Sequence, residues 1–493
     1  MQFRCARVGW VVGMLLCGRR GWGRGLALGA AACVAISATA RAETLESALI
    51  QAYINNPSLN SQRALLRATD ENVPQALSGY RPKITITGQG GQQTMSSNTR
   101  VVEPNLPANV PPNSPATYAI QSGYNTPANY GATITQTLFN GFQTASKTRQ
   151  AESQVLSARA TLRVTEQTVL LSAATAYMNV LRDSAILDLQ RRNVEVLQEQ
   201  LRQTRDRFNV GEVTRTDVAQ SESRLAAGRS QVLAAEATYK ASVATYRQVI
   251  GVEPGNLTAG APVDRFSPNT LNSAVGLATA VHPSITTAQY NVDAAQQAVK
   301  VAEATLYPTV SVTGQYTKNY EMAGTLNTIE QYQATVLGTI SVPIYQGGAE
   351  YSLVRQAKET LGQRRLDLDT ARDTVRQNTV QSWGQLEAAK ATVDSASAQV
   401  QAAEIALNGV REEARVGQRT TLDVLNAQQE LVNARVSLVG AQRDRVVASY
   451  TLLASTGRLA PEVLGLRVPV YQPQVHYQQV RDTWFGLRTP DGR

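Results

Sequence analysis

Two kinds of hydrophobic pattern recur along the chain. Short segments alternate apolar and polar side chains, as in Ile84-Thr85-Ile86-Thr87, and this period of two predicts β-strands. Longer segments rich in Ala, Gln, Glu, Arg and Leu predict α-helices. We expect strands at about 82–90, 130–139, 308–316 and 332–345, and helices at about 44–78, 143–208, 215–249, 284–305, 349–414 and 421–455.

The two longest expected helices, 143–208 and 349–414, contain no proline. At 1.5 Å per residue each would be roughly 100 Å long, whereas a globular helix averages about 12 residues. Small side chains, as in Ala173-Ala174, would let such helices approach one another closely. These lengths favour rods and tubes over globular cores.

The chain contains an internal duplication. Asn56-Pro57-Ser58 recurs 226 residues later as His282-Pro283-Ser284, and Leu138-Phe139-Asn140-Gly141 recurs 206 residues later as Ile344-Tyr345-Gln346-Gly347. The first repeat is therefore 20 residues longer than the second. We expect the extra residues, which lie between Gln89 and Leu138 and are rich in proline, to form a long irregular loop.

The repeats divide the chain into segments. We predict a first structural repeat at 43–257, a linker at 258–269, a second repeat at 270–457 and a tail at 458–493. Each repeat would hold a helix, a β-hairpin and a long helical hairpin. The tail contains four prolines and is expected to be irregular, with no assigned role.

Residues 1–42 have the features of a secretory signal peptide. They contain six arginines, no acidic residue, an apolar run and the small-residue pattern Ala40-Arg41-Ala42. Translation could start at Met1 or Met14, and an N-terminal membrane anchor is the alternative. Loss of these arginines lowers the formal charge from +9 to +3, so we expect no nucleic-acid partner.

The composition argues against an enzyme. All three cysteines lie in residues 1–42, and the two histidines, His282 and His476, are far apart in sequence. No glycine-rich phosphate loop occurs. We therefore expect no catalytic residue, no cofactor and no metal site.

The expected strands favour an oligomer. Four strands cannot close a membrane barrel, which needs about eight, and unpaired strand edges are very costly in lipid. If the strands enter a membrane, several chains must share one barrel, with twelve strands in a trimer or eight in a dimer. A soluble sheet remains the alternative for each hairpin taken alone.

The order of these motifs resembles the TolC family of outer-membrane efflux and secretion channels over about 43–457. The resemblance rests on the duplication, on the two strand-to-helix motifs ending in Gly141 and Gly347, and on the turns within 208–218 and 416–428. It implies a mainly α fold with a membrane β-barrel: a long α-helical barrel plus four β-strands per protomer, with a trimer forming a 12-stranded barrel.

The resemblance also implies a function and partners. The protein would be a homotrimeric, passive, gated duct of a tripartite efflux or type I secretion system. It would lie in outer-membrane lipid of a Gram-negative bacterium, extend into the periplasm, and dock to a periplasmic adaptor (membrane fusion) protein and an inner-membrane transporter. The alternative is an exported coiled-coil structural or adhesion protein without a pore.

The expected turns between the long helices carry the candidate site residues. Gly211 and Gly417 suit helix reversal, and Thr214-x-x-Asp217 and Thr420-x-x-Asp423 suit capping boxes of the helices that follow. The resemblance implies a periplasmic aperture at Asp423, Asn426 and Arg419, and hairpin-tip and adaptor contacts at Val210, Gly211, Asp217, Val416 and Gly417. Capping alone would also explain both aspartates, and Arg419 could simply be solvated.

The resemblance is incomplete at one position. The family uses two rings of aspartates at the aperture, and Asn426 stands where the second would be. An asparagine ring would be polar but uncharged, so we expect weaker block by cations than a second carboxylate ring would give.

Overall fold

The structure is a computed structural model that describes residues 43–100, 118–321, 329–490 and 492. These residues belong to one unit, Ala42–Arg493. The predicted signal peptide, 1–42, lies outside the described residues. Among the residues that are described, no helix has both the length and the apolar character needed to cross a membrane.

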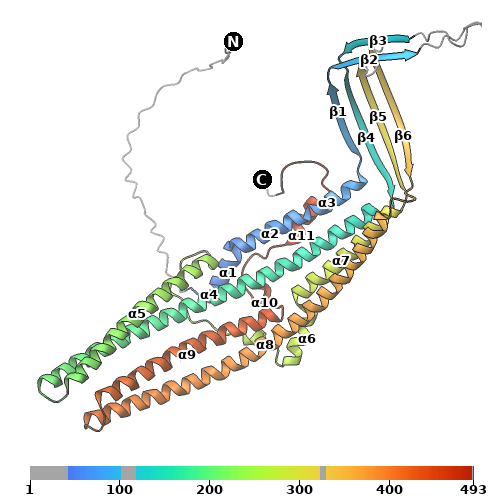
Figure 1. Cartoon of the computed structure of the whole chain (residues 1–493). Helices are drawn as coiled ribbons and strands as arrows, with labels where there is room; N and C mark the ends of the chain where they lie inside the picture. The colour runs from blue at the N-terminus through green and yellow to red at the C-terminus, as the bar shows by residue number, and fades with distance from the viewer. Residues whose placement is uncertain (1–42, 101–117, 322–328, 491, 493) are drawn as a thin grey trace, which may run out of the picture. The chain divides into compact units, whose positions relative to one another are not determined.

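The long helices lie close to where the sequence predicts them (Figure 1). They form two helical hairpins, α4 with α5 and α8 with α9, and α4 also packs against α9. Their bounds are α4 Gln143–Asn209, α5 Arg215–Ile250, α8 Ala349–Arg415 and α9 Thr421–Ser455. At 1.5 Å per residue, the 67 residues of α4 and of α8 each extend roughly 100 Å.

Shorter helices precede the strands. In the first repeat the expected helix 44–78 is divided into α1 Leu45–Asn55, α2 Pro57–Asp70, α3 Asn72–Leu77 and the 3-10 turn η1 Ser78–Tyr80. Before the second pair of strands they are η2 Asp264–Phe266, which falls in the expected linker, α6 Leu271–Val281, α7 Pro283–Glu303 and η3 Ala304–Leu306. The side chains of Asn56 and His282 cap α2 and α7, whose first residues are prolines, so the recurring Asn/His-Pro-Ser motif begins a helix in both repeats.

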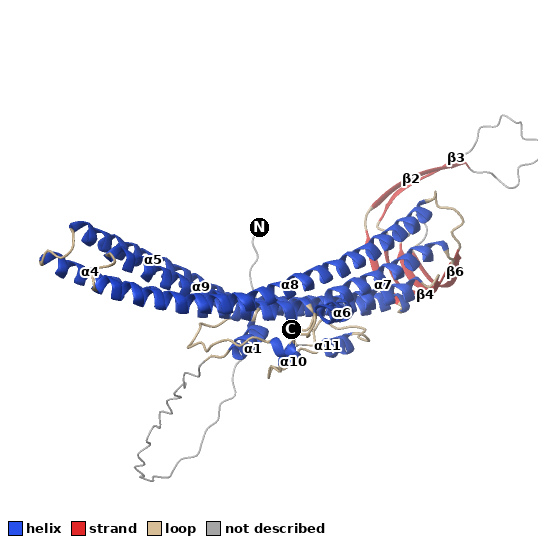
Figure 2. Ribbon diagram, turned by 90° about the horizontal axis from the view of Figure 1, so that it is seen from below, coloured by secondary structure: helices blue, strands red, loops and turns tan. Residues whose placement is uncertain are grey.

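Four strands form one antiparallel sheet in the order β1-β4-β5-β6 (Figure 1). The strands lie at one end of the long helices (Figure 2). Their bounds are β1 Lys83–Gly90, β4 Ala128–Asn140, β5 Thr309–Tyr320 and β6 Glu330–Ser341. The β4–β5 pairing joins the two repeats, with Thr135 opposite Thr313. The outer strands of this sheet, β1 and β6, each have one edge that no strand of the described chain pairs.

The insertion in the first repeat differs from the expected irregular loop. It contains β2 Gln93–Arg100 and β3 Tyr118–Asn125, which pair antiparallel as a separate two-stranded sheet, with Ser96 opposite Ser122. Five prolines of the insertion fall within 101–117, outside the described residues, and Pro127 lies between β3 and β4. The flanking segments are rich in polar side chains, so they lack the apolar alternation that would have indicated strands.

The tail also differs from expectation, because it contains α10 Pro461–Leu464 and α11 Pro473–Val480. Pro461 and Pro473 each occupy the first position of a helix, where proline is tolerated because its missing N–H has no helical acceptor. The tail is fixed to the first repeat: His476 Nδ1 lies 2.9 Å from Asp70 Oδ2, and the backbone N–H of Tyr471 donates to the Tyr53 hydroxyl over 3.3 Å.

The largest hydrophobic core lies where α1, α4, α5 and α9 meet the tail. Tyr177 and Tyr246 are fully buried there, and the Tyr177 hydroxyl lies 2.8 Å and 2.7 Å from the carbonyl oxygens of Glu43 and Thr258. Ala173 and Ala174 of α4 are also fully buried, which allows neighbouring helices close approach. This core holds the long helices together between the strands and the hairpin ends.

Candidate functional site at the helical hairpin tips

The candidate site lies at the two turns that join the long helices, here called the first tip (210–214) and the second tip (416–420). Gly211 and Gly417 have φ of +76° and +81° in the left-handed region. Each accompanies helix-ending bonds: Glu212 N–H donates to the Arg207 carbonyl over 2.9 Å, and Gln418 N–H to the Glu413 carbonyl over 2.9 Å. Both glycines have open space where a Cβ would lie, so backbone conformation alone favours glycine.

Matching capping boxes begin the return helices. The backbone N–H and hydroxyl of Thr214 donate to Asp217 Oδ2 over 2.9 Å and 2.7 Å, and those of Thr420 donate to Asp423 Oδ2 over 3.0 Å and 2.8 Å. Both aspartates therefore have the helix-capping role that the sequence predicts. These bonds, from the Thr420 backbone first and its side chain second, lower the pKa of Asp423, so its carboxyl is ionised at neutral pH.

Arg419 is placed within its own hairpin. Its Nε donates to Glu413 Oε2 over 2.8 Å, and both side chains are about half exposed. The resemblance implies that this arginine ties the second hairpin to a neighbour, and within the described protomer it contacts Glu413 of α8 instead. The bond to Glu413 and its charge, and to a smaller extent the charge of Asp423, raise the pKa of Arg419.

The two hairpins are linked by a residue outside the tip motifs. Arg224 of α5 donates from Nη2 to Asn426 Oδ1 of α9 over 2.7 Å. Leu425, adjacent to Asn426, is buried in a small apolar cluster with Leu197, Leu201 and Leu225 of the first hairpin. Asn426 is thus the acceptor of a contact between hairpins, and sequence reasoning missed its donor because the two residues are 202 positions apart.

The outermost residues of the tips are exposed. Val210 is 78% and Val416 is 71% accessible, which is high for apolar side chains beside a helix end. No hydrophobic cluster of the described chain includes either valine. The tips therefore present two valine–glycine pairs to their surroundings.

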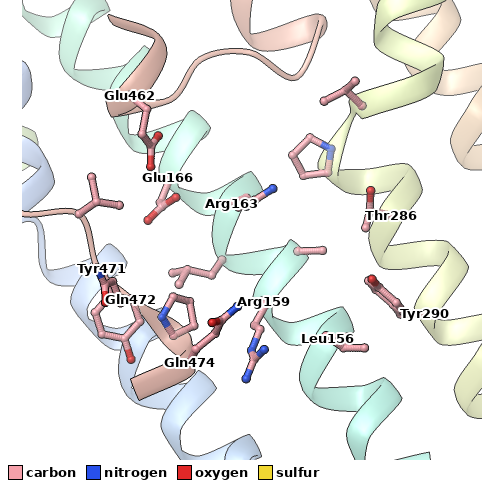
Figure 3. A pocket seen from close by; sticks show the side chains of 16 residues that line it. Leu156, Arg159, Arg163, Glu166, Thr286, Tyr290, Glu462, Tyr471, Gln472 and Gln474 are labelled. Carbon is pink, nitrogen blue, oxygen red and sulfur yellow. The ribbon is translucent and has the colours of Figure 1, made fainter. Parts of the chain in front are cut away.

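A cavity of about 510 Å³ lies farther along α4, beside the tail (Figure 3). Arg159, Arg163 and Glu166 of α4 line it together with Glu462 and Gln474 of the tail. Burial raises the pKa of Glu166, although the Tyr53 hydroxyl donates to its Oε1 over 3.0 Å. Among the described residues, no group of three His, Cys, Asp or Glu side chains is placed to hold a metal ion.

Comparisons with known proteins agree with this architecture. The family model described as "Outer membrane efflux protein" matches residues 48–252 and 274–458. The outer membrane efflux protein BepC of Brucella suis is 43% identical over 469 residues, covering 94% of this chain and 97% of the relative. The outer membrane protein TolC of Escherichia coli is 26% identical over 457 residues, covering 89% and 87%.

A solved structure shares the fold. The CmeC outer membrane channel of Campylobacter jejuni superposes with a TM-score of 0.71 and 16% sequence identity, covering 89% of each chain. The family model matches each repeat separately, and the similarity to BepC extends over nearly the whole of both chains. The chain therefore belongs to the outer membrane efflux protein family and is a channel protein of the outer membrane.

Proposed function

We propose that this protein is the outer-membrane duct of a tripartite efflux or type I secretion system, formed by three copies and closed at its periplasmic tips. The observation that carries the proposal is the four-stranded sheet, whose two outer edges pair with no other described strand and which is continuous with helices of 67 residues. The family is a transport family, so we expect passive conduction with energy supplied by an inner-membrane partner. A coiled-coil rod without a pore is set aside by the family assignment.

The strand edges support sharing of one barrel between copies. Edges cannot stay unpaired in lipid, so β6 of one copy needs β1 of the next. The pairing inside the chain provides the expected register. The repeat offset of 206 residues relates β4 to β6, and the offset of 226 residues relates β1 to β5. The pair of Thr135 and Thr313 therefore corresponds to Ser341 opposite Thr87 of the partner subunit. Three copies give twelve strands in one closed barrel.

The second tip is the proposed aperture. Three copies of Asp423 would place three ionised carboxylates around the axis, and the field of such a ring attracts and holds cations. Asn426 would form an uncharged second ring, one helical turn away, and Arg419 would stabilise the tip through Glu413. The capping role of Asp423 is compatible with this one, because the capping bonds occupy only its Oδ2 atom.

The exposed tips are the proposed contact with a periplasmic adaptor. Apolar side chains that remain exposed next to a turn are typical of docking surfaces. The contact would use Val210, Gly211 and Asp217 of the first tip region and Val416 and Gly417 of the second. The adaptor would connect these tips to the inner-membrane transporter.

Opening of the aperture would require the hairpins to separate, which predicts a role for Arg224. Replacing Arg224 with alanine removes the contact with Asn426, an exposed hydrogen bond worth about 1 kcal/mol. We expect the open population, and hence the mean resting conductance of purified channels in planar bilayers, to rise about fivefold.

The matched control is Arg435→Ala. Arg435 pairs with Glu404 over 2.7 Å within the second hairpin, so its loss should leave conductance unchanged. Equal conductance of Arg224→Ala and the unmodified protein would contradict the proposed role of the Arg224–Asn426 contact in holding the aperture closed. Absence of any conductance from inserted unmodified protein would contradict the proposed duct itself.

A further inference from the structure

The residues that follow α11 present an exposed apolar group. Trp484 is 65% and Phe485 is 91% accessible, and Leu487 is fully exposed. Single exposed apolar side chains are common on proteins, but three large ones within four residues form a patch that indicates a binding partner. Here the segment 482–488 is called the apolar tail segment.

The apolar tail segment is fixed beside the start of β1. Arg81, two residues before that strand, donates from Nη1 to the Thr483 carbonyl over 2.7 Å. The Arg81 guanidinium also lies over the Trp484 ring, 4.7 Å from its centroid. Upstream, Arg481 pairs with Glu152 of α4 over 3.6 Å, so contacts on both sides of Asp482 hold the segment against the first repeat.

The apolar tail segment lies at the junction between the strands and the helices, where exposed aromatic residues gather. Each of the four strands of the large sheet meets the helical part of the chain next to an exposed aromatic side chain: Tyr80, Phe142, Tyr307 and Tyr345, which are 54%, 69%, 53% and 75% accessible. Aromatic girdles of this kind mark the membrane–water interface of outer-membrane proteins. In the proposed duct, on which this inference rests, Trp484 therefore lies at the level where the membrane-embedded strands end.

The charges around the apolar tail segment suit a phospholipid surface. Arg81 and Lys83 lie at the start of β1, and Arg488 follows Leu487 directly. Asp482 is the single acidic residue of the segment. Basic side chains that flank tryptophan and leucine are typical of segments that lie in the headgroup region of a bilayer.

We propose that the apolar tail segment is a peripheral membrane anchor, in which Trp484, Phe485 and Leu487 insert into the periplasmic leaflet beside the strands of the same protomer. The occupant of this surface is lipid, because the segment continues the aromatic level of the strands and carries basic flanks. The anchor would fix the height and tilt of the helices relative to the membrane through α11 and its contacts with α2 and α4.

Tryptophan fluorescence with brominated lipids tests this anchor in the full chain. All variants carry Trp10→Phe and Trp22→Phe. Adding Trp383→Phe leaves Trp484 as the reporter of the apolar tail segment. Adding Trp484→Phe instead leaves Trp383, inside α8, as the control reporter. Both are reconstituted into vesicles of phosphatidylcholine and phosphatidylglycerol at about three to one. The phosphatidylcholine is brominated near the headgroup, near the chain end, or not at all.

We expect bromine near the headgroup to lower Trp484 emission at least about twofold, bromine near the chain end to lower it less, and neither to change Trp383 emission. Equal behaviour of the two tryptophans would overturn the proposal. A Trp484 emission that is already blue-shifted in detergent and insensitive to bromine would also overturn it, because a second copy or another protein would then cover the segment. Conductance of the same preparations confirms insertion, so failed quenching is distinguished from a failed channel.

Discussion

Replacing Asp423 with asparagine should weaken the block of the channel by a divalent cation about a hundredfold. A ring of three carboxylates attracts a divalent ion by several kcal/mol even at a high effective dielectric constant, and the substitution removes all three charges at once. Asparagine keeps a side-chain oxygen that can accept from the Thr420 N–H and hydroxyl, so the helix cap is largely retained. The measurement is the concentration of cation that halves single-channel current.

Asp217→Asn provides the matched control. Asp217 has the same capping geometry in the first hairpin, with bonds of 2.9 Å and 2.7 Å from Thr214. Only the second tip is expected at the aperture, so this variant should keep the cation affinity of the unmodified channel. Equal losses in the two variants would show that the field of the whole tip region, rather than a ring at Asp423, binds the cation.

Replacing Gly141 with alanine should prevent most chains from assembling. Gly141 connects β4 to α4 with φ of +61°, and a Cβ there would lie 2.5 Å from the Tyr307 Cβ and 2.9 Å from the Ala304 carbonyl oxygen. Backbone and Cβ atoms cannot move aside as a flexible side chain can. We expect a cost of about 3 kcal/mol or more, measured as loss of assembled channel from outer-membrane extracts.

Gly465→Ala is the control that separates the steric clash of the added Cβ at position 141 from the strain of a positive φ. Gly465 has a similar φ of +68°, but no atom lies within 4 Å of the position of its added Cβ. This variant should cost only about 1 kcal/mol and assemble nearly normally. Similar yields of the Gly141 and Gly465 variants would mean that the junction between β4 and α4 tolerates displacement and does not position the sheet rigidly on the helices.

The sequence predicted the long helices and the four main strands well because their signals are local. Proline-free runs of strong helix formers, bounded by Gly211 and Gly417 and by the capping threonines, place the ends of the long helices within one or two residues. The strands β2 and β3 were missed because their polar side chains lack the expected alternation. The helices of the tail were missed because Pro461 and Pro473 indicate a helix start as well as a break.

The candidate site was predictable only in part, for a related reason. The turn glycines and capping aspartates follow from spacing within a few residues, and the structure places them at the tips. The Arg224–Asn426 contact depends on how two hairpins pack, and no local pattern encodes it. Likewise, the contact of Arg81 with Trp484 joins residues about four hundred positions apart. The aperture role of Asp423, Asn426 and Arg419 stays a prediction from the resemblance.

The edges of the four-stranded sheet are expected to pair between copies and to close a ring of three. Residues 43–493 contain no cysteine, so engineered cysteines would be the sole thiols of that part of the chain. The double variant Thr87→Cys, Ser341→Cys places one thiol on β1 and one on β6, at the pair that corresponds to Thr135 and Thr313 inside the chain. Cα partners across antiparallel strands are close enough for a disulfide or a short thiol cross-linker.

Denaturing electrophoresis after oxidation in intact outer membranes is the most direct measurement. A closed ring of three predicts covalent species of one, two and three chains and no larger product, with the three-chain species dominant at full oxidation. Neither single variant should give more than a trace of cross-linked product, because each chain would then carry one thiol, and the identical thiols of different copies would lie on non-adjacent strands. A ladder that continues past three chains, or a double variant that remains monomeric, would contradict the account.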